Sequence, residues 1–188
     1  MQPAHAFRNA AELLADGDAV AAKRALESAF PAPGVSTTRR AWTKTRLLRV
    51  FIRDGFTDRY DGKLLVFPGA LRAMSVLAPD LVPYHSNWKQ DSTHPAYWSL
   101  YSTIDHVIPV ARQGADDESN AVTTSMLHNA AKANWLLSEL GWSEPLPTVG
   151  SDWDGLLPWF CTEYDKRPEL KAIPVLQAWR SAVKSAAF

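Results

Sequence analysis

The stretch that decides the fold runs from residue 103 to residue 142 and reads TIDHVIPVARQGADDESNAVTTSMLHNAAKANWLLSELGW. Thr103 to Ile108 is rich in β-branched residues and predicts a short strand, which a proline ends. A polar loop follows, and Ala121 to Thr124 predicts a second short strand. Ser125 is a good N-cap for a helix that we expect to run to about Leu140, where Gly141 can end it. The predicted order is therefore strand, loop, strand and helix.

Polar residues stand at particular places in these predicted elements. Asp105 and His106 are neighbours on the first strand, and Asn120 closes the loop. Asn129 lies in the first turn of the helix, and Lys132 follows one turn later. Taken singly, a histidine in a strand is usually structural, and an asparagine before a helix is usually a cap. The ordered set is much harder to meet by chance than a lone His-Asn pair, so we interpret it as a functional motif.

The motif resembles that of the HNH nuclease family. In that family a ββα-metal motif carries Asp-His on its first strand, an asparagine at the end of the loop, and asparagine or histidine on the helix, often as N-x-x-K. The matching residues here are Asp105-His106, Asn120 and 129-NAAK-132. The resemblance implies an α+β fold in which a small ββα-metal core is embedded in a mostly helical single domain. It also implies metal-dependent hydrolysis of phosphodiester bonds in DNA.

Phosphodiester hydrolysis needs the residue types found in this motif. A neutral imidazole is a natural general base near neutral pH, and the resemblance gives this role to His106. Asp105 and Asn129 offer oxygen ligands for a hard divalent cation, Mg²⁺ by preference and Mn²⁺ as the alternative. Asn120 is expected to fix the loop by hydrogen bonds to backbone near His106, and Lys132 is expected to contact a phosphate. Because neighbours on a strand point to opposite faces, we expect Asp105 and His106 to point in different directions unless the strand is bent.

His128 precedes the asparagine of the helix, and three interpretations of it stay open: an extra metal ligand, a DNA contact, or neither. It stands where many members of the resembled family carry a zinc-binding cysteine. Cys161 is the one cysteine of the chain, so a disulfide within the chain and a four-cysteine zinc site are both excluded. We therefore expect no structural zinc, and the cysteine count fits a cytoplasmic protein.

A basic stripe is predicted on a helix from Thr38 to Asp54. Arg46, Arg49 and Arg53 stand at positions i, i+3 and i+7 of this helix, which places them on one side of it. One interpretation is an ordinary solvated face, and the other is a clamp that positions double-stranded DNA by its backbone. The chain has 20 basic and 20 acidic residues, so affinity for DNA has to come from such a local patch.

The remaining sequence divides into supporting segments around the motif. Residues 1–35 are expected to form a helical extension. Within it, Ala10 to Phe30 is rich in alanine and leucine and predicts one helix or two short ones, broken at Asp16–Asp18. Residues 36–102 hold the basic helix and an aromatic-rich support region. Residues 103–142 hold the motif, and residues 143–188 predict a C-terminal helical packing segment.

The support region contains a turn-rich part and an aromatic part. Asp61-Gly62 is a hairpin signal, and the strands of this hairpin are expected at Phe56–Tyr60 and Leu64–Phe67. A short apolar helix is predicted from Ala70 to Leu77. Residues 79–101 are rich in proline, histidine and aromatic residues, and we expect them to form a packed loop beneath the motif, with a contact to DNA as the alternative.

Three functions of different classes stay open. The first is a DNA endonuclease used in restriction of foreign DNA or by a mobile element; because one ββα-metal motif attacks one strand, a homodimer is expected for a double-strand break. The second is a catalytically inactive nucleic-acid-binding module on the same fold. The third is a protein-interaction domain in which the four polar residues are structural. No run of residues is long and apolar enough to cross a membrane, so no membrane partner is expected.

Overall fold

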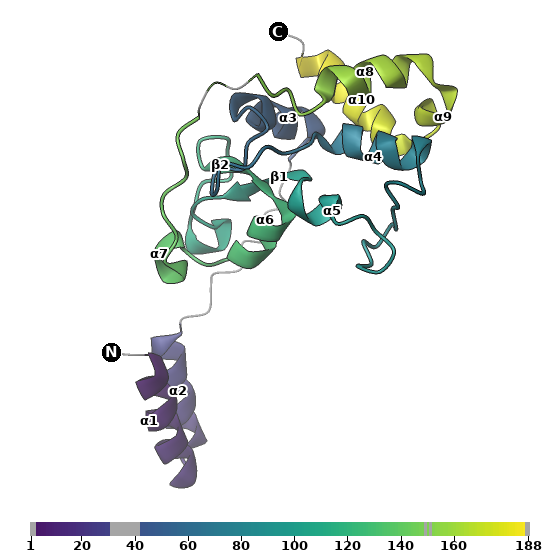
Figure 1. Cartoon of the computed structure of the whole chain (residues 1–188). Helices are drawn as coiled ribbons and strands as arrows, with labels where there is room; N and C mark the ends of the chain where they lie inside the picture. The colour runs from purple at the N-terminus through teal and green to yellow at the C-terminus, as the bar shows by residue number, and fades with distance from the viewer. Residues whose placement is uncertain (1–2, 31–41, 149, 151, 187–188) are drawn as a thin grey trace. The chain divides into compact units, whose positions relative to one another are not determined.

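Helices dominate the described part of the chain, and one pair of short strands lies among them. The structure is a computed structural model that describes residues 3–30, 42–148, 150 and 152–186 (Figure 1). It is a mixed α+β fold, as the sequence predicted. Among the described helices, none combines the length and the apolar character needed to cross a membrane. The elements are α1 (Pro3–Ala15), α2 (Ala19–Ala29), α3 (Lys44–Arg53), α4 (Pro68–Leu77), α5 (Ala96–Ser99), β1 (Ser102–His106), the 3₁₀ turn η1 (Val110–Arg112), β2 (Ala121–Ser125), α6 (Met126–Lys132), α7 (Leu137–Leu140), α8 (Leu157–Lys166), α9 (Pro168–Lys171) and α10 (Pro174–Ala186).

The chain divides into two compact units, Met1–Ser36 and Thr37–Phe188. The first unit corresponds to the helical extension predicted for residues 1–35. It forms a unit of its own, which differs from the expected single domain. The second unit holds the basic helix, the motif and the C-terminal helices around a shared core.

Two helices, α1 and α2, make up the described part of the first unit. The predicted break between them is confirmed, since α1 ends at Ala15 and α2 begins at Ala19. The Asp18 carboxylate caps α2 by accepting a hydrogen bond of 2.9 Å from the backbone N–H of Ala21, which satisfies one of the free donors of the first turn. Small side chains are buried where the helices pack: Ala6, Ala10 and Ala22.

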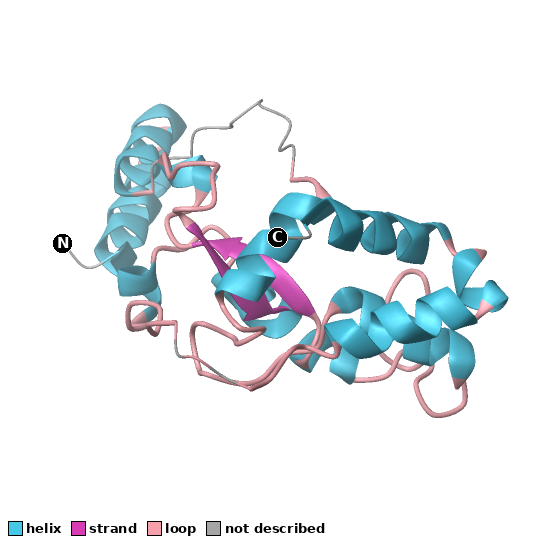
Figure 2. Ribbon diagram, turned by 90° about the horizontal axis from the view of Figure 1, so that it is seen from above, coloured by secondary structure: helices cyan, strands magenta, loops and turns pink. Residues whose placement is uncertain are grey.

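The two strands form an antiparallel ladder. β1 pairs with β2 from Ser102 opposite Ser125 to His106 opposite Ala121 (Figure 2). All five residues of β2 are buried, so this strand is covered on both faces. α6 begins directly after β2, and the hydroxyl of Ser125 caps it by accepting a hydrogen bond from the backbone N–H of His128 (3.3 Å). The predicted order of strand, loop, strand and helix is confirmed, although the first strand ends at His106 instead of two residues later.

The predicted long helix is wrong in its C-terminal half. α6 ends at Lys132, and Ala133 takes a positive φ of 45°, a conformation that costs energy in a residue other than glycine. Residues 133–135 are exposed, so a continued helix would have had no apolar face against the protein at this point. α7 is a separate turn, and Gly141 ends it in the left-handed conformation, as predicted.

The main core joins α3, α4, α8 and α10 (Figure 1). Trp179 packs its ring against Phe51 and Phe67, with centroids 6.2 Å and 5.1 Å apart. Phe160 of α8 adds a further edge-on contact to Phe67 at 5.3 Å. α3 contacts both strands and α10, so it connects the aromatic core to the strand pair.

The segment between α3 and β1 differs from the prediction in its strands. Gly62 has the positive φ of 79° that a glycine tolerates at a turn, but the two predicted strands reduce to an isolated bridge between Thr57 and Leu64. α4 begins at Pro68, two residues before the prediction, because a proline suits the first turn of a helix. The aromatic loop packs into a second buried cluster around Tyr97, in line with the packed-loop interpretation.

Candidate functional site

Three of the predicted site residues border one cavity with a volume of about 370 Å³. Asp105 and His106 reach it from the end of β1, and Asn129 reaches it from α6. Both residues border the same cavity, but their side chains contact different partners: Asp105 contacts Tyr60 and Lys132, and His106 contacts Asp116. The lining is completed by Trp42, Leu47, Ile104, Pro109, Val110, Ala133 and Asn134.

Asp105 is a buried carboxylate with one occupied oxygen. Its exposed fraction is 6%, and its Oδ2 accepts hydrogen bonds from the ammonium of Lys132 (2.8 Å) and the hydroxyl of Tyr60 (2.5 Å). Burial raises the pKa of Tyr60 far above its ordinary value, and the Asp105 carboxylate raises it further, so this hydroxyl stays protonated and donates. Within the described part of the chain, Oδ1 of Asp105 accepts no hydrogen bond.

Lys132 lies inside the protein. Its exposed fraction is 0%, and its ammonium contacts Asp105 and donates to the carbonyl oxygen of His106 (2.7 Å). The predicted phosphate contact is therefore wrong for this structure, because the ammonium does not reach solvent. A buried ammonium needs such partners to offset its lost hydration, and these contacts tie the end of α6 to the end of β1.

A carboxylate that the sequence did not single out contacts the imidazole of His106. Oδ1 of Asp116 lies 2.9 Å from Nε2 of His106, and the same oxygen accepts a hydrogen bond of 2.6 Å from the indole N–H of Trp42. Trp42 also packs edge-on against the imidazole, with the ring centroids 5.6 Å apart. In the sequence Asp116 is one of three consecutive acidic residues in a polar loop, and nothing in its spacing distinguishes it from the other two.

Asn120 holds the loop between the two strands. Its amide nitrogen donates to the carbonyl oxygens of Ile108 and Ala115, both at 2.8 Å, and its Oδ1 accepts from the backbone N–H of Ile108 at 3.0 Å. The predicted hydrogen bonds to backbone near His106 are therefore present. Gly114 lies beside them, and a Cβ built there would stand 1.8 Å from the carbonyl oxygen of Ile108, so only glycine fits.

Asn129 is half-buried on α6 and borders the cavity with Asp105. Its side-chain amide has no hydrogen-bond partner among the residues that the structure describes. Asp105 and Asn129 thus each offer the cavity an oxygen that no described donor occupies. Carboxylate and amide oxygens are ligands that Mg²⁺ and Mn²⁺ accept, so the chemistry of these two side chains fits a divalent cation.

Comparisons with known proteins do not add a family to this geometry. Family models, characterised proteins and solved structures were all searched, and none matched the chain. The resemblance to HNH nucleases therefore rests on the motif residues and on their placement in the fold.

Arg53, which the sequence predicts as a DNA contact, also has contacts within the fold. Its guanidinium pairs with Asp54 at 2.8 Å and donates to the carbonyl oxygens of Glu118 (2.7 Å) and Ala121 (2.6 Å). Asp54 is itself buried and accepts a hydrogen bond of 2.7 Å from the backbone N–H of Thr123. These contacts hold the end of α3 against β2, while 40% of the Arg53 side chain stays exposed.

The other two arginines of the predicted stripe differ from each other. Arg46 stacks on the ring of Trp42, 4.1 Å from its centroid, and lies 3.6 Å from the carboxylate of Glu118. Arg49 is exposed and has no partner among the described residues. Arg49 is therefore the member of the stripe without a described partner, whereas the side chains of Arg46 and Arg53 have partners and are 30% and 40% exposed.

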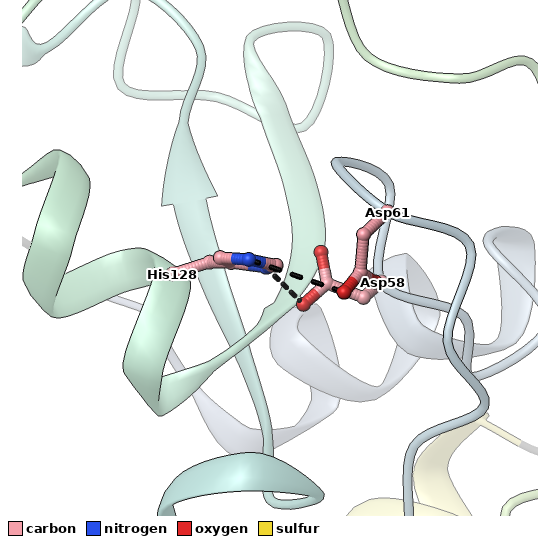
Figure 3. A group of neighbouring side chains, drawn as sticks. All are labelled: Asp58, Asp61 and His128. Carbon is pink, nitrogen blue, oxygen red and sulfur yellow. Dashed lines mark hydrogen bonds and ion pairs between the residues drawn. The ribbon is translucent and has the colours of Figure 1, made fainter. Parts of the chain in front are cut away.

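His128 is on α6 but does not border the cavity of Asp105 and His106. Its Nδ1 lies 2.8 Å from Oδ2 of Asp58, and its Nε2 lies 4.0 Å from Oδ2 of Asp61 (Figure 3). The DNA contact predicted for His128 would therefore lie outside the candidate site. The sequence offered only a turn signal at the two aspartates, because Asp58 lies 70 residues before His128.

Proposed function

We propose that this protein is a metal-dependent nuclease that hydrolyses phosphodiester bonds in DNA. The observation that carries the proposal is the meeting of Asp105, His106 and Asn129 at one cavity. A carboxylate, an imidazole and an amide oxygen are the groups that this hydrolysis uses. The order of the elements that present them, two strands and a helix, resembles the ββα-metal motif of HNH nucleases.

Asp105 and Asn129 would hold the divalent cation, which the resemblance gives as Mg²⁺ or Mn²⁺. When bound, such a cation supplies stabilisation of the negative charge that develops on the phosphate. Lys132 and Tyr60 hold Oδ2 of Asp105, and they thereby fix the direction of Oδ1. Partners of this kind, which orient a ligand without touching the ion, usually increase the affinity of the site for the metal ion.

His106 acts as the general base in this proposal. A neutral imidazole that donates from Nε2 to Asp116 keeps Nδ1 as its proton acceptor. Asp116 and Trp42 would then hold the ring in one orientation, since a base works best when a third group fixes its position. The cavity beside His106 provides space for a water molecule and a phosphate.

Double-stranded DNA is the substrate that the resemblance suggests, with restriction of foreign DNA or a mobile element as the biological setting. Arg49 provides an exposed guanidinium for a phosphate contact. A double-strand break would need two copies of the motif, and hence a homodimer. Sedimentation that shows only monomers on a cleaved duplex would contradict the dimer.

Cleavage of supercoiled plasmid tests the nuclease proposal. We expect cutting with Mg²⁺ or Mn²⁺ and none with EDTA. His106→Ala is expected to reduce the rate by at least about 10²-fold, because a general base contributes a factor of this size. His85→Ala is the matched control, since His85 lies within the aromatic-rich residues 79–101 and does not border the cavity. Equal rates for His106→Ala and the unmodified protein would remove His106 from the mechanism.

A catalytically inactive nucleic-acid-binding module is the second candidate, and one observation favours it. Side chains of the protein already contact two groups of the motif: Asp116 contacts His106, and Lys132 contacts Asp105. Such a module would bind duplex DNA with salt-dependent affinity and would not cut it with either metal. Fluorescence anisotropy of a labelled duplex, measured on the samples used for the cleavage assay, separates binding from turnover.

A further inference from the structure

A second cluster of metal-ligand side chains lies between α6 and the turn that follows α3. It consists of Asp58, Asp61 and His128, and one donor atom from each lies within 4.8 Å of the others. Figure 3 shows the imidazole of His128 pointing from α6 toward both carboxylates. None of the three residues borders the cavity of the proposed nuclease site.

Asp58 fixes the orientation of the imidazole. Its carboxylate is buried, and Oδ2 contacts Nδ1 of His128 at 2.8 Å while accepting a hydrogen bond from the backbone N–H of Ser125 at 2.8 Å. Its Oδ1 accepts from the backbone N–H of Tyr60 and from the hydroxyl of Thr124, both at 3.0 Å. A histidine that donates one ring N–H to a carboxylate presents its other nitrogen as a metal ligand, and in His128 that nitrogen is Nε2.

Asp61 supplies a carboxylate opposite that nitrogen. Its Oδ2 lies 4.0 Å from Nε2 of His128, which is too long for a hydrogen bond. Because zinc bonds to nitrogen and carboxylate oxygen are each about 2.0–2.2 Å long, a tetrahedral ion would place the two atoms about 3.4 Å apart, so Asp61 would have to move about 0.6 Å closer to His128 to bind it. The present partner of Asp61 is Lys63 at 2.8 Å, whose ammonium is exposed and easily displaced.

The space around His128 suits a cation. Beside the imidazole lies a cavity of about 300 Å³, lined by Tyr60, His128, Trp142 and Ser143. This space can hold the water molecules that complete a coordination shell.

We propose that Nε2 of His128 and the carboxylate of Asp61 bind a divalent cation of the zinc class, with Asp58 orienting the imidazole. The mixture of one imidazole and one carboxylate favours zinc over Mg²⁺, which prefers oxygen ligands alone. The expectation of no structural zinc considered cysteine ligands, whereas this site uses nitrogen and oxygen. The bound ion would link the turn after α3 to α6, and the site stands independently of nuclease activity.

Titration with Co²⁺, a coloured substitute for zinc, tests the proposal in the full chain. We expect visible absorption bands of a Co²⁺ ion at this cluster, beside any Co²⁺ that the nuclease cavity binds, and a higher thermal midpoint in Zn²⁺ than in EDTA. Asp61→Asn and His128→Gln should each weaken Co²⁺ binding by at least about tenfold. Asp91→Asn is the control, because Asp91 is exposed and far from His128 in the sequence. Circular dichroism without metal checks that Asp61→Asn, a change on a turn, remains folded.

Asn129→Ala separates this site from the proposed nuclease cavity. The absorption bands that depend on Asp61 and His128 should persist in that variant and saturate at one equivalent, because Asn129 is a proposed ligand of the cavity and does not belong to the cluster. Three results would overturn the proposal: no bound Co²⁺, equal affinity in Asp61→Asn and the unmodified chain, or loss of binding in Asn129→Ala instead of Asp61→Asn. Failure of plasmid cleavage would leave it standing, since none of its measurements needs DNA.

Discussion

Two histidines lie on the same strand–strand–helix unit, and each is held by an aspartate from another segment. Asp116 contacts Nε2 of His106, whereas Asp58 contacts Nδ1 of His128. We call the surroundings of His106 the first region and the surroundings of His128 the second region. They differ in which other groups lie beside the imidazole ring. His106 borders a cavity together with the amide of Asn129, while the second nitrogen of His128 faces another carboxylate.

This difference shows that an imidazole in contact with an aspartate does not define a function by itself. The surroundings of its second nitrogen decide what the histidine can do, because that atom is either a proton acceptor or a metal ligand. Beside an open cavity, the atom can take a proton from a bound water molecule. Beside a fixed carboxylate, it can share a cation. Four predictions follow the comparison, ordered by the size of the expected effect.

The largest effect is expected where the first region depends on a buried charge. Lys132→Met leaves the buried carboxylate of Asp105 without its cation and should lower the free energy of unfolding by about 3–5 kcal/mol. Urea unfolding followed by tryptophan fluorescence measures this change. Lys63→Met is the control, because Lys63 pairs with Asp61 at the surface, and its unfolding midpoint should stay unchanged. Similar midpoints for the two variants would show that the buried pair contributes nothing to stability.

A smaller loss of stability is expected in the second region, and substitutions of its two aspartates should differ in the size of that loss. Asp58→Asn removes a charged acceptor from the backbone N–H of Ser125 and from His128, which should cost about 1–3 kcal/mol. Asp61→Asn should leave stability in EDTA unchanged, because Asp61 lies on a turn and pairs with an exposed lysine. Thermal unfolding in EDTA compares the two variants. A larger loss in Asp61→Asn would reverse the roles that we assign to the two carboxylates.

Asp116→Asn tests whether the first region works as a positioned base. If the protein cleaves plasmid, this variant should cut about tenfold to a hundredfold more slowly, because a misplaced catalytic group costs rate of this order. Asp117→Asn in the same loop is the matched control, since Asp117 contacts Ser119 and not the imidazole. Both variants should unfold at the same temperature. Equal cleavage rates would show that His106 keeps its orientation without Asp116.

The smallest effect is a pH dependence at the tyrosine between the two regions. Burial is the largest cause that raises the pKa of Tyr60, and the Asp105 carboxylate adds to it, whereas an ordinary tyrosine has a pKa of 10.0. The unfolded chain therefore releases this proton first, so the free energy of unfolding falls as pH rises above 10. Ultraviolet titration of tyrosinate, with Tyr60→Phe as the control, measures the pKa of Tyr60 in the folded protein. Ionisation of Tyr60 in the folded protein at pH 10 would contradict the assigned hydrogen bond to Asp105.

How much of the fold could be predicted depended on the distance between interacting residues in the sequence. The cap at Ser125, the break at Asp18 and the loop-closing role of Asn120 all use local contacts or a recognisable motif, and each is present. The end of α6 was missed because it depends on which face of the helix the rest of the protein covers. Residue periodicity contains no information about a partner element.

The same limit applied to the candidate site. Asp105, His106 and Asn129 were predicted as a set and do meet at one cavity. Lys132 was placed correctly on the helix, but its spacing could not tell a solvent-facing ammonium from a buried one. Tyr60 lies 45 residues from Asp105, and a contact across such a separation has no signal in a single sequence.

Tyr60 gives the two regions a shared constraint on sequence change. Its hydroxyl donates to Asp105, its ring packs edge-on against His128 at 6.2 Å, and its backbone N–H donates to Asp58. Phenylalanine at this position would keep the ring and lose the donor, and serine would keep a donor and lose the ring. A lineage that abandoned one region would still be under selection at Tyr60 through the other, so this tyrosine is expected to outlast either histidine in evolution.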